Sequence, residues 1–145
     1  DVHITLVQSV AVTGAVIVTT PQEVGLIISM KTLRLFQQTK VHVLGIVENM
    51  SYYVCPHCGV REEIFGHGGA RRRSEELDIP FLGEIPLDRA IRHHADTGTP
   101  IVVAEPQGSL AQAYRAIVEQ VAAQVSIRNY TYTSAASLEI AEVPG

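Results

Sequence analysis

Short apolar runs alternate along this chain with segments in which apolar side chains recur every three or four positions. Residues 15–20 and 41–47 are β-branched apolar runs, typical of strands that are buried on both faces. Residues 21–38 lie between them with helical periodicity, and Thr20 and Glu23 predict the helix start as a capping box. A strand, a helix and a second strand predict a βαβ unit with parallel strands and a right-handed crossover.

The second half of the chain continues this alternation. The pattern predicts a polar helix at 70–77, a strand at 81–85, a helix at 88–97, a short apolar run at 101–104 and an amphipathic helix at 109–125. The expected fold class is therefore α/β, with an open, mostly parallel sheet flanked by helices. We expect residues 1–126 to form one domain, and residues 127–145 to be a tail that is disordered or adds a strand.

Composition narrows the function classes. The chain has 145 residues, of which 46% are hydrophobic and 18% charged, as expected of one folded domain. Its net charge of −4 and the lack of a long basic run disfavour a nucleic-acid partner. No apolar stretch has the length of a membrane span and no secretory signal pattern opens the chain, so we expect no membrane association. A single Cys-x-x-Cys pair in a domain of this size is unlike a secreted disulfide scaffold, which favours a reducing cytoplasm.

Polar residues follow two of the predicted strands. Glu48 and Asn49 come directly after one apolar run, and Pro86, Leu87 and Asp88 come after another. In an open parallel sheet, ligands bind at the carboxyl ends of the strands. These two strand ends are therefore the expected location of a site.

The only two cysteines, Cys55 and Cys58, lie just beyond the first of these strand ends. Thiolates suit zinc and iron–sulfur clusters, but either usually takes four protein ligands, so two ligands are missing. A thioredoxin-like redox pair is less favoured, because no helix start follows the pair to lower a thiol pKa. The remaining alternative is two loop cysteines, free or joined in a disulfide, that hold no metal.

Five ordered segments carry a family resemblance. Residues 13–22 (TGAVIVTTPQ), 45–52 (GIVENMSY), 55–58 (CPHC), 64–69 (IFGHGG) and 81–88 (FLGEIPLD) resemble the Mrp/ApbC family. Its members are P-loop ATPases related to MinD that are regarded as iron–sulfur cluster carriers. The resemblance covers roughly residues 1–125.

The resemblance implies the missing metal ligands. In the family, the cysteine pairs of two subunits meet in a homodimer, so Cys55 and Cys58 of each chain would hold one bridging [4Fe–4S] cluster for delivery to apo iron–sulfur proteins. Homodimerisation or a rearrangement is also our hypothesis for how the exposed sheet edge is protected. The competing hypotheses are a zinc-bridged structural dimer without catalytic activity and a truncated product with no activity.

The resemblance also implies a nucleotide site. Related ATPases contact adenine through an Asn at the position of Asn49, while a loop matching Pro86, Leu87 and Asp88 packs on the base. Without the resemblance, the residues favour simpler structural roles: Asn49 caps the end of a strand, and Pro86 only turns the chain.

The sequence departs from the family in one important respect. It contains no Gly-x-x-x-x-Gly-Lys-Ser/Thr phosphate loop, so it resembles the C-terminal portion of such an ATPase, with Asp1 at the end of a Pro-Pro-Gly-Thr-Gly-Asp segment. We therefore expect no catalytic residues, no ATP hydrolysis by this chain alone, and ATP binding that depends on an N-terminal half. Ile28, Ser29 and Met30 also replace a polar, Asp-containing stretch of the family.

The remaining polar candidates have simpler explanations. His57 is expected to be an exposed loop residue, and His67 to belong to a glycine-rich turn. Arginines 71–73 are expected on a solvated helix face, and His93 and His94 at a helix C-terminus where their charge suits the dipole.

Overall fold

The computed structural model describes residues 2–141, with side chains described through residue 133. Its elements are α1 (Val2–Ser9), β1 (Ala15–Thr19), α2 (Glu23–Gln38), β2 (Val43–Asn49), β3 (Tyr53–Val54), β4 (Arg61–Glu62), α3 (Gly69–Glu76), β5 (Phe81–Ile85), α4 (Arg89–Asp96), α5 (Ile101–Ala104) and α6 (Ser109–Ala141). The predicted alternation of strands and helices is confirmed across this range.

The main sheet has three parallel strands in the order β1–β2–β5. β2 is central, and its C-terminal residues pair with both neighbours: Glu48 is opposite Thr19 of β1 and Glu84 of β5. The polar ends of the strands therefore lie side by side at one edge of the sheet, as parallel pairing requires. The predicted open parallel α/β fold is confirmed.

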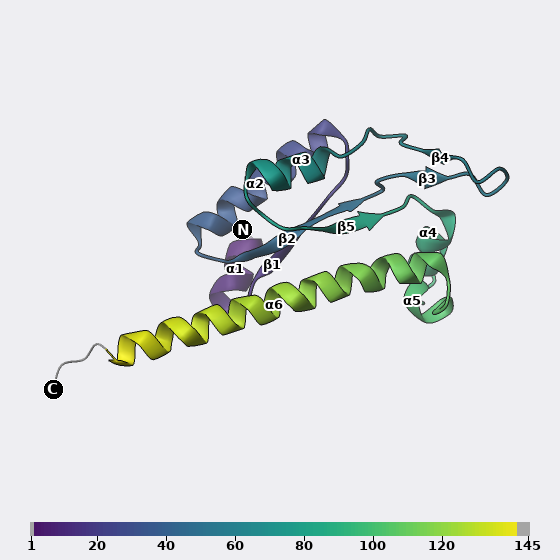
Figure 1. The fold of residues 1–145 in the computed structure, drawn as a ribbon. Coiled ribbons are helices and arrows are strands. Elements are labelled where there is room, and N and C mark those ends of the chain that lie inside the picture. The colour runs from purple at the N-terminus through teal and green to yellow at the C-terminus, as the bar shows by residue number, and fades with distance from the viewer. Residues whose placement is uncertain (1, 142–145) are drawn as a thin grey trace.

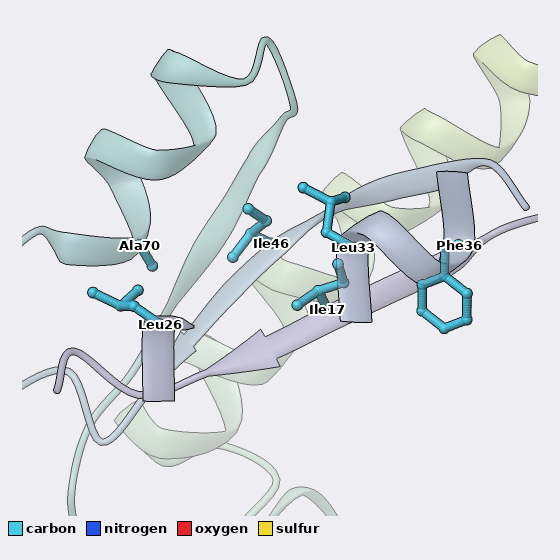
Figure 2. Packing of buried hydrophobic residues seen from close by; sticks show 6 residues of the cluster. All are labelled: Ile17, Leu26, Leu33, Phe36, Ile46 and Ala70. Atoms are coloured by element: carbon cyan, nitrogen blue, oxygen red, sulfur yellow. The ribbon is translucent and has the colours of Figure 1, made fainter. Parts of the chain in front are cut away.

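Helices cover both faces of this sheet. α2 and α3 lie on one face, and the long helix α6 crosses the other (Figure 1). Successive residues of a strand point to opposite faces, so Ile46 faces α2 and α3 while Val47 faces α6. Figure 2 shows the core on the α2 side, which contains Ile17, Leu26, Leu33, Phe36, Ile46 and Ala70.

The predicted capping box at Thr20 and Glu23 is wrong. α2 begins at Glu23 after an extended Gln22, and no side-chain hydrogen bond caps the helix. Its first helical bond runs from the Leu26 N–H to the Gln22 carbonyl at 3.0 Å. The chain bends at the buried Pro21, which makes Gln22 rather than Thr20 the residue that precedes the helix. The Thr20 hydroxyl lies against Gly25 in the first turn, 2.4 Å from where a Cβ would stand, but it makes no capping hydrogen bond.

The tail prediction is also wrong for residues 127–141, which neither form a strand nor lack structure. They continue α6 as one helix of 33 residues. Arg128, Asn129 and Tyr132 line a hollow together with residues 11–13, and this spacing of contacts is helical. Residues 142–145 of the predicted tail lie outside the described range.

The short apolar run at 101–104 is a single helical turn, α5. Despite the length of α6, no helix in the described part of the chain is both long and apolar enough to cross a membrane.

Candidate functional site

The carboxylate of Glu48, at the end of β2, is fully buried with 0% of the residue exposed. Its Oε1 accepts a hydrogen bond of 2.7 Å from the Ser51 hydroxyl, and its Oε2 accepts one of 2.8 Å from the Ala70 backbone N–H. Ala70 lies in the first turn of α3, where unpaired N–H groups favour a negative charge. Glu48 therefore joins the strand end, the following turn and the start of a helix.

A glycine allows α3 to begin this close to the sheet. A Cβ on Gly69 would lie 2.6 Å from Leu26 Cδ1, closer than real side chains approach, and 3.3 Å from the Pro21 carbonyl oxygen, which is also tight. The preceding loop places the exposed His67 with its Nδ1 2.9 Å from Glu63 Oε1, in the turn that the glycines predicted. Because Glu48 already occupies this helix N-terminus, we find no support for a phosphate site there.

The structure brings together the two strand ends that were predicted to form a nucleotide site. Asn49 is paired with Ile85, the residue directly before Pro86. Beyond them, the Ser51 N–H donates to the Ile85 carbonyl at 3.0 Å, and the Leu87 N–H donates to the Tyr52 carbonyl at 2.7 Å. The predicted adenine-contact residues thus belong to one continuous edge.

Two of these residues also have local structural roles. Asn49 Oδ1 accepts from the Met50 N–H at 2.9 Å and stabilises the left-handed Met50, whose φ is 55°. Asp88 Oδ1 accepts from the Ala90 N–H at 2.7 Å and caps α4. Pro86 is buried and Leu87 is half-buried, which makes this a firm rather than a mobile strand exit.

The two cysteines lie at the tip of a hairpin formed by β3 and β4. The hairpin extends beyond the main sheet, past the end of β5 (Figure 1). The Cys55 N–H donates to the Val60 carbonyl at 2.9 Å, and the Gly59 N–H donates to the Cys55 carbonyl at 2.8 Å. Gly59 has a φ of 73°, a left-handed backbone conformation that glycine adopts without steric cost and that this turn requires.

Both thiols are free, with Cys55 half-buried and Cys58 exposed. The backbone N–H of Cys58, and next that of His57, point at the Cys55 sulfur and lower the pKa of its thiol, with a smaller contribution from the Cys58 side chain. The sequence disfavoured an activated thiol because no helix starts here. The tight turn supplies by itself the N–H donors that a helix start would have provided.

The described residues contain no group of three or more His, Cys, Asp or Glu side chains arranged to hold a metal ion. His57 is exposed at the turn, as predicted, and adds no third ligand there. Within the described chain, the cysteine turn is therefore a two-thiolate donor set, which fits half of a four-thiolate site.

One arginine connects the hairpin to the main sheet. The guanidinium of Arg61, on β4, lies 3.8 Å from the centroid of the Tyr52 ring. Its Nη2 also lies 3.3 Å from Glu84 Oε2 on β5 and 3.7 Å from Glu63 Oε1.

Sequence reasoning singled out neither Arg61 nor the bonding of Glu48. A signal existed for Glu48, because a carboxylate directly ends an otherwise apolar run and must find donors if it is buried. No comparable signal marks Arg61, because Tyr52 and Glu84 come from two other segments of the chain.

Comparisons with known proteins agree with this fold. The family model ParA, described as the NUBPL iron-transfer P-loop NTPase, matches residues 1–122. The chain is 50% identical to an iron-sulfur cluster carrier protein of Deinococcus radiodurans. The match extends over 128 residues, which are 88% of this chain and 36% of the relative. The chain spans about a third of the length of the curated relatives that it matches.

Two solved structures share the fold. A nucleotide-binding protein from Archaeoglobus fulgidus, in complex with ADP and with Co found in it, has a TM-score of 0.61 at 40% identity, over 74% of this chain and 43% of that chain. The cell division ATPase MinD of Pyrococcus furiosus has a TM-score of 0.58 at 25% identity, over 75% and 42% of the two chains.

Glu48→Ala is expected to destabilise the fold by about 2–4 kcal/mol, because the buried Ala70 N–H and Ser51 hydroxyl lose their shared acceptor. Urea denaturation measures the change. The matched control is Glu75→Ala on the exposed side of α3, which should change stability by less than about 0.5 kcal/mol. Equal effects of the two substitutions would contradict the structural role of Glu48.

Alkylation of Cys55 is expected to begin at lower pH in the folded protein than in the unfolded chain, because the turn N–H groups lower the thiol pKa. The measurement is the pH dependence of the iodoacetamide rate in Cys58→Ala, which leaves one thiol, with the same variant in urea as control. The lower folded pKa also means that the thiolate favours folding above the unfolded pKa and loses this effect as pH falls through the folded pKa. Identical pH profiles in buffer and urea would be inconsistent with this turn geometry.

Proposed function

The chain belongs to the ParA family of NUBPL iron-transfer P-loop NTPases, and we propose that it binds an iron–sulfur cluster through Cys55 and Cys58 and passes the cluster to apo-proteins. The observation that carries this proposal is the cysteine turn. It presents two free thiols on a hairpin tip, and its own backbone N–H groups favour the thiolate at Cys55. Thiolates are the ligands that iron–sulfur clusters take.

The cluster we propose is a [4Fe–4S] cluster that bridges a homodimer. Cys55 and Cys58 provide two thiolates per chain, and a cubane cluster takes four, so two hairpins supply a complete set. The position of the turn supports this arrangement, because the hairpin extends beyond the sheet and exposes Cys58 to a second chain.

The exposure of Cys58 also supports delivery of the cluster to apo iron–sulfur proteins. Transfer requires that recipient thiolates replace the carrier's thiolates one at a time, so the recipient must reach the cluster ligands. Several relatives bear the name of iron-sulfur cluster carrier or transfer protein, which supports a carrier over a site for permanent storage.

We also propose that Asn49, Pro86, Leu87 and Asp88 contact adenine in a longer protein that supplies a phosphate loop. The structure supports this by joining the two strand ends into one edge. The Archaeoglobus fulgidus protein, 40% identical over 74% of this chain, is described in complex with ADP. The chain itself contains no phosphate-loop motif, so we assign it no catalytic residues.

A reducing compartment such as the cytoplasm suits this function. Both cysteines are free in the structure, and a carrier needs its thiols reduced to hold the cluster.

Anaerobic reconstitution of the purified chain with iron and sulfide is expected to load about two iron atoms per chain, half of a [4Fe–4S] cluster, and to double the mass in light scattering. Cys55→Ala and Cys58→Ala should each lose the visible sulfur-to-iron absorption. His57→Ala is the matched control in the same turn, because the exposed His57 side chain is not a proposed ligand, and it should load like the parent chain.

The alternative is a zinc-bridged structural dimer, and the same samples distinguish it from the carrier. Tight zinc binding without cluster uptake would replace the carrier with that dimer. Cluster uptake by a monomer would contradict the bridging arrangement, and uptake that survives both cysteine substitutions would contradict the assigned ligands.

The chain is expected to release no phosphate from ATP above the buffer blank, because no backbone cradle and no lysine hold the β- and γ-phosphates. A phosphate-release assay with an intact P-loop ATPase as positive control measures this. Turnover that rises in proportion to the amount of purified chain would disprove it.

A further inference from the structure

Tyr52 lies between the proposed adenine contact at Asn49 and the cysteine turn, and the structure holds this residue at both ends. Its backbone carbonyl accepts a 2.7 Å hydrogen bond from the Leu87 N–H, in the loop at residues 86–88. Its ring lies under the Arg61 guanidinium, 3.8 Å from the centroid, on the returning strand of the hairpin. Tyr52 therefore contacts both the loop at residues 86–88 and the strand of the hairpin that follows the cysteine turn.

Arg61 connects the hairpin back to the sheet. Its Nη2 lies 3.3 Å from Glu84 Oε2, whose side chain is only 19% exposed, and Glu84 is three residues before Leu87 along the chain. Exposed ion pairs stabilise little by themselves, but a cation over an aromatic ring and a second contact on a partly buried carboxylate act on the same guanidinium. The contact between Arg61 and Glu84 joins β4 to β5.

The rest of the hairpin offers little restraint. β3 and β4 have two residues each, and their pairing is limited to Tyr53 with Glu62 and Val54 with Arg61. Two-stranded hairpins of this length are marginal alone. The orientation of the cysteine turn relative to the sheet therefore depends on contacts at the base of the hairpin.

We propose that Tyr52 and Arg61 link the loop at residues 86–88 to the cysteine turn, and that Arg61 is the positioning residue that holds the turn in place. The role of this link in cluster binding rests on the proposed function. Two chains share one cluster only if both turns present their sulfurs within bonding distance, and a displacement of the loop at 86–88 reaches the turn through Tyr52. The link is thus the route by which a ligand at the strand edge alters cluster binding.

A double-mutant cycle on the metal-free chain tests this link. Asp88→Ala removes the α4 cap and so disturbs the loop at residues 86–88 without changing a residue of the hairpin. Arg61→Met keeps the length of the side chain but removes its charge and planar group. The measurement is amide hydrogen exchange at Cys55, whose N–H bonds to Val60 inside the hairpin.

Arg61→Met is expected to speed exchange at Cys55 about fivefold, which corresponds to roughly 1 kcal/mol. Asp88→Ala is expected to speed exchange at Cys55 in the parent chain. In the Arg61→Met chain it should cause no further increase, because the link between the loop at residues 86–88 and the cysteine turn is already broken. The matched control is Arg92→Met on α4, an exposed arginine with one ion pair to Asp96, which should leave Cys55 unchanged.

Two other results would contradict the proposed link between the loop at residues 86–88 and the cysteine turn. No change in Arg61→Met removes the positioning role. Additive effects of Arg61→Met and Asp88→Ala mean that the two segments act independently. If Arg61→Met fails to fold in thermal denaturation, the same cycle is run with Arg61→Lys, which retains the charge but not the planar fork and should give a smaller, still non-additive effect.

A second measurement connects the link to the cluster. On the reconstituted chain, Arg61→Met should lose its cluster to a chelator faster than the parent, and Arg61→Lys should restore part of the lifetime. A parent chain that takes up no cluster refutes the proposed function while the exchange cycle still decides the link. An unchanged cluster lifetime in Arg61→Met refutes the positioning role for the cluster.

Discussion

The buried carboxylate of Glu48 is the constraint on which this site depends. Removing a carboxylate from water costs several kcal/mol unless donors replace the lost hydration. Ser51 and the first turn of α3 provide those donors, so the strand end, the turn after it and the helix start must keep one arrangement. Because Ser51 also donates its N–H to Ile85, this arrangement fixes the chain where it leaves the sheet toward the cysteines.

The base of the hairpin is therefore rigid, while its tip is exposed. Glu48 and Ser51 anchor the start of the segment, and Arg61 holds the returning strand near β5. The thiols themselves lie in a turn held by short backbone bonds and open to solvent. This division suits a site that must present its sulfurs in a defined direction and still let another protein reach them.

The sequence predicted the sheet well because buried parallel strands are continuous apolar runs, and the Cys-x-x-Cys spacing made the metal hypothesis visible. It failed where tertiary contacts decide the outcome. Thr20 has the residue type of a helix cap, but the bend at Pro21 places Gln22 at the cap position, and the Thr20 hydroxyl makes no capping hydrogen bond. The alternation after residue 126 resembled a strand, yet contacts at Arg128 and Tyr132 follow a helix. The lowered pKa of Cys55 and the contacts of Arg61 depend on backbone and side-chain positions that residue types do not specify.

Splitting the ligands between two chains has a thermodynamic consequence for the proposed carrier. A chain that supplied all four thiolates would hold a cluster with an affinity set by its own fold. With two thiolates per chain, cluster affinity is coupled to chain association, so whatever weakens the contact between hairpins also weakens cluster binding by the same free energy. Release then requires only a change in the orientation of one turn, and the residues that set this orientation, Tyr52 and Arg61, contact the edge where the nucleotide is proposed to bind. Two thiolates per chain, on a hairpin that Arg61 holds near the sheet, thus allow a cluster with four thiolate ligands to be bound firmly and still be transferred.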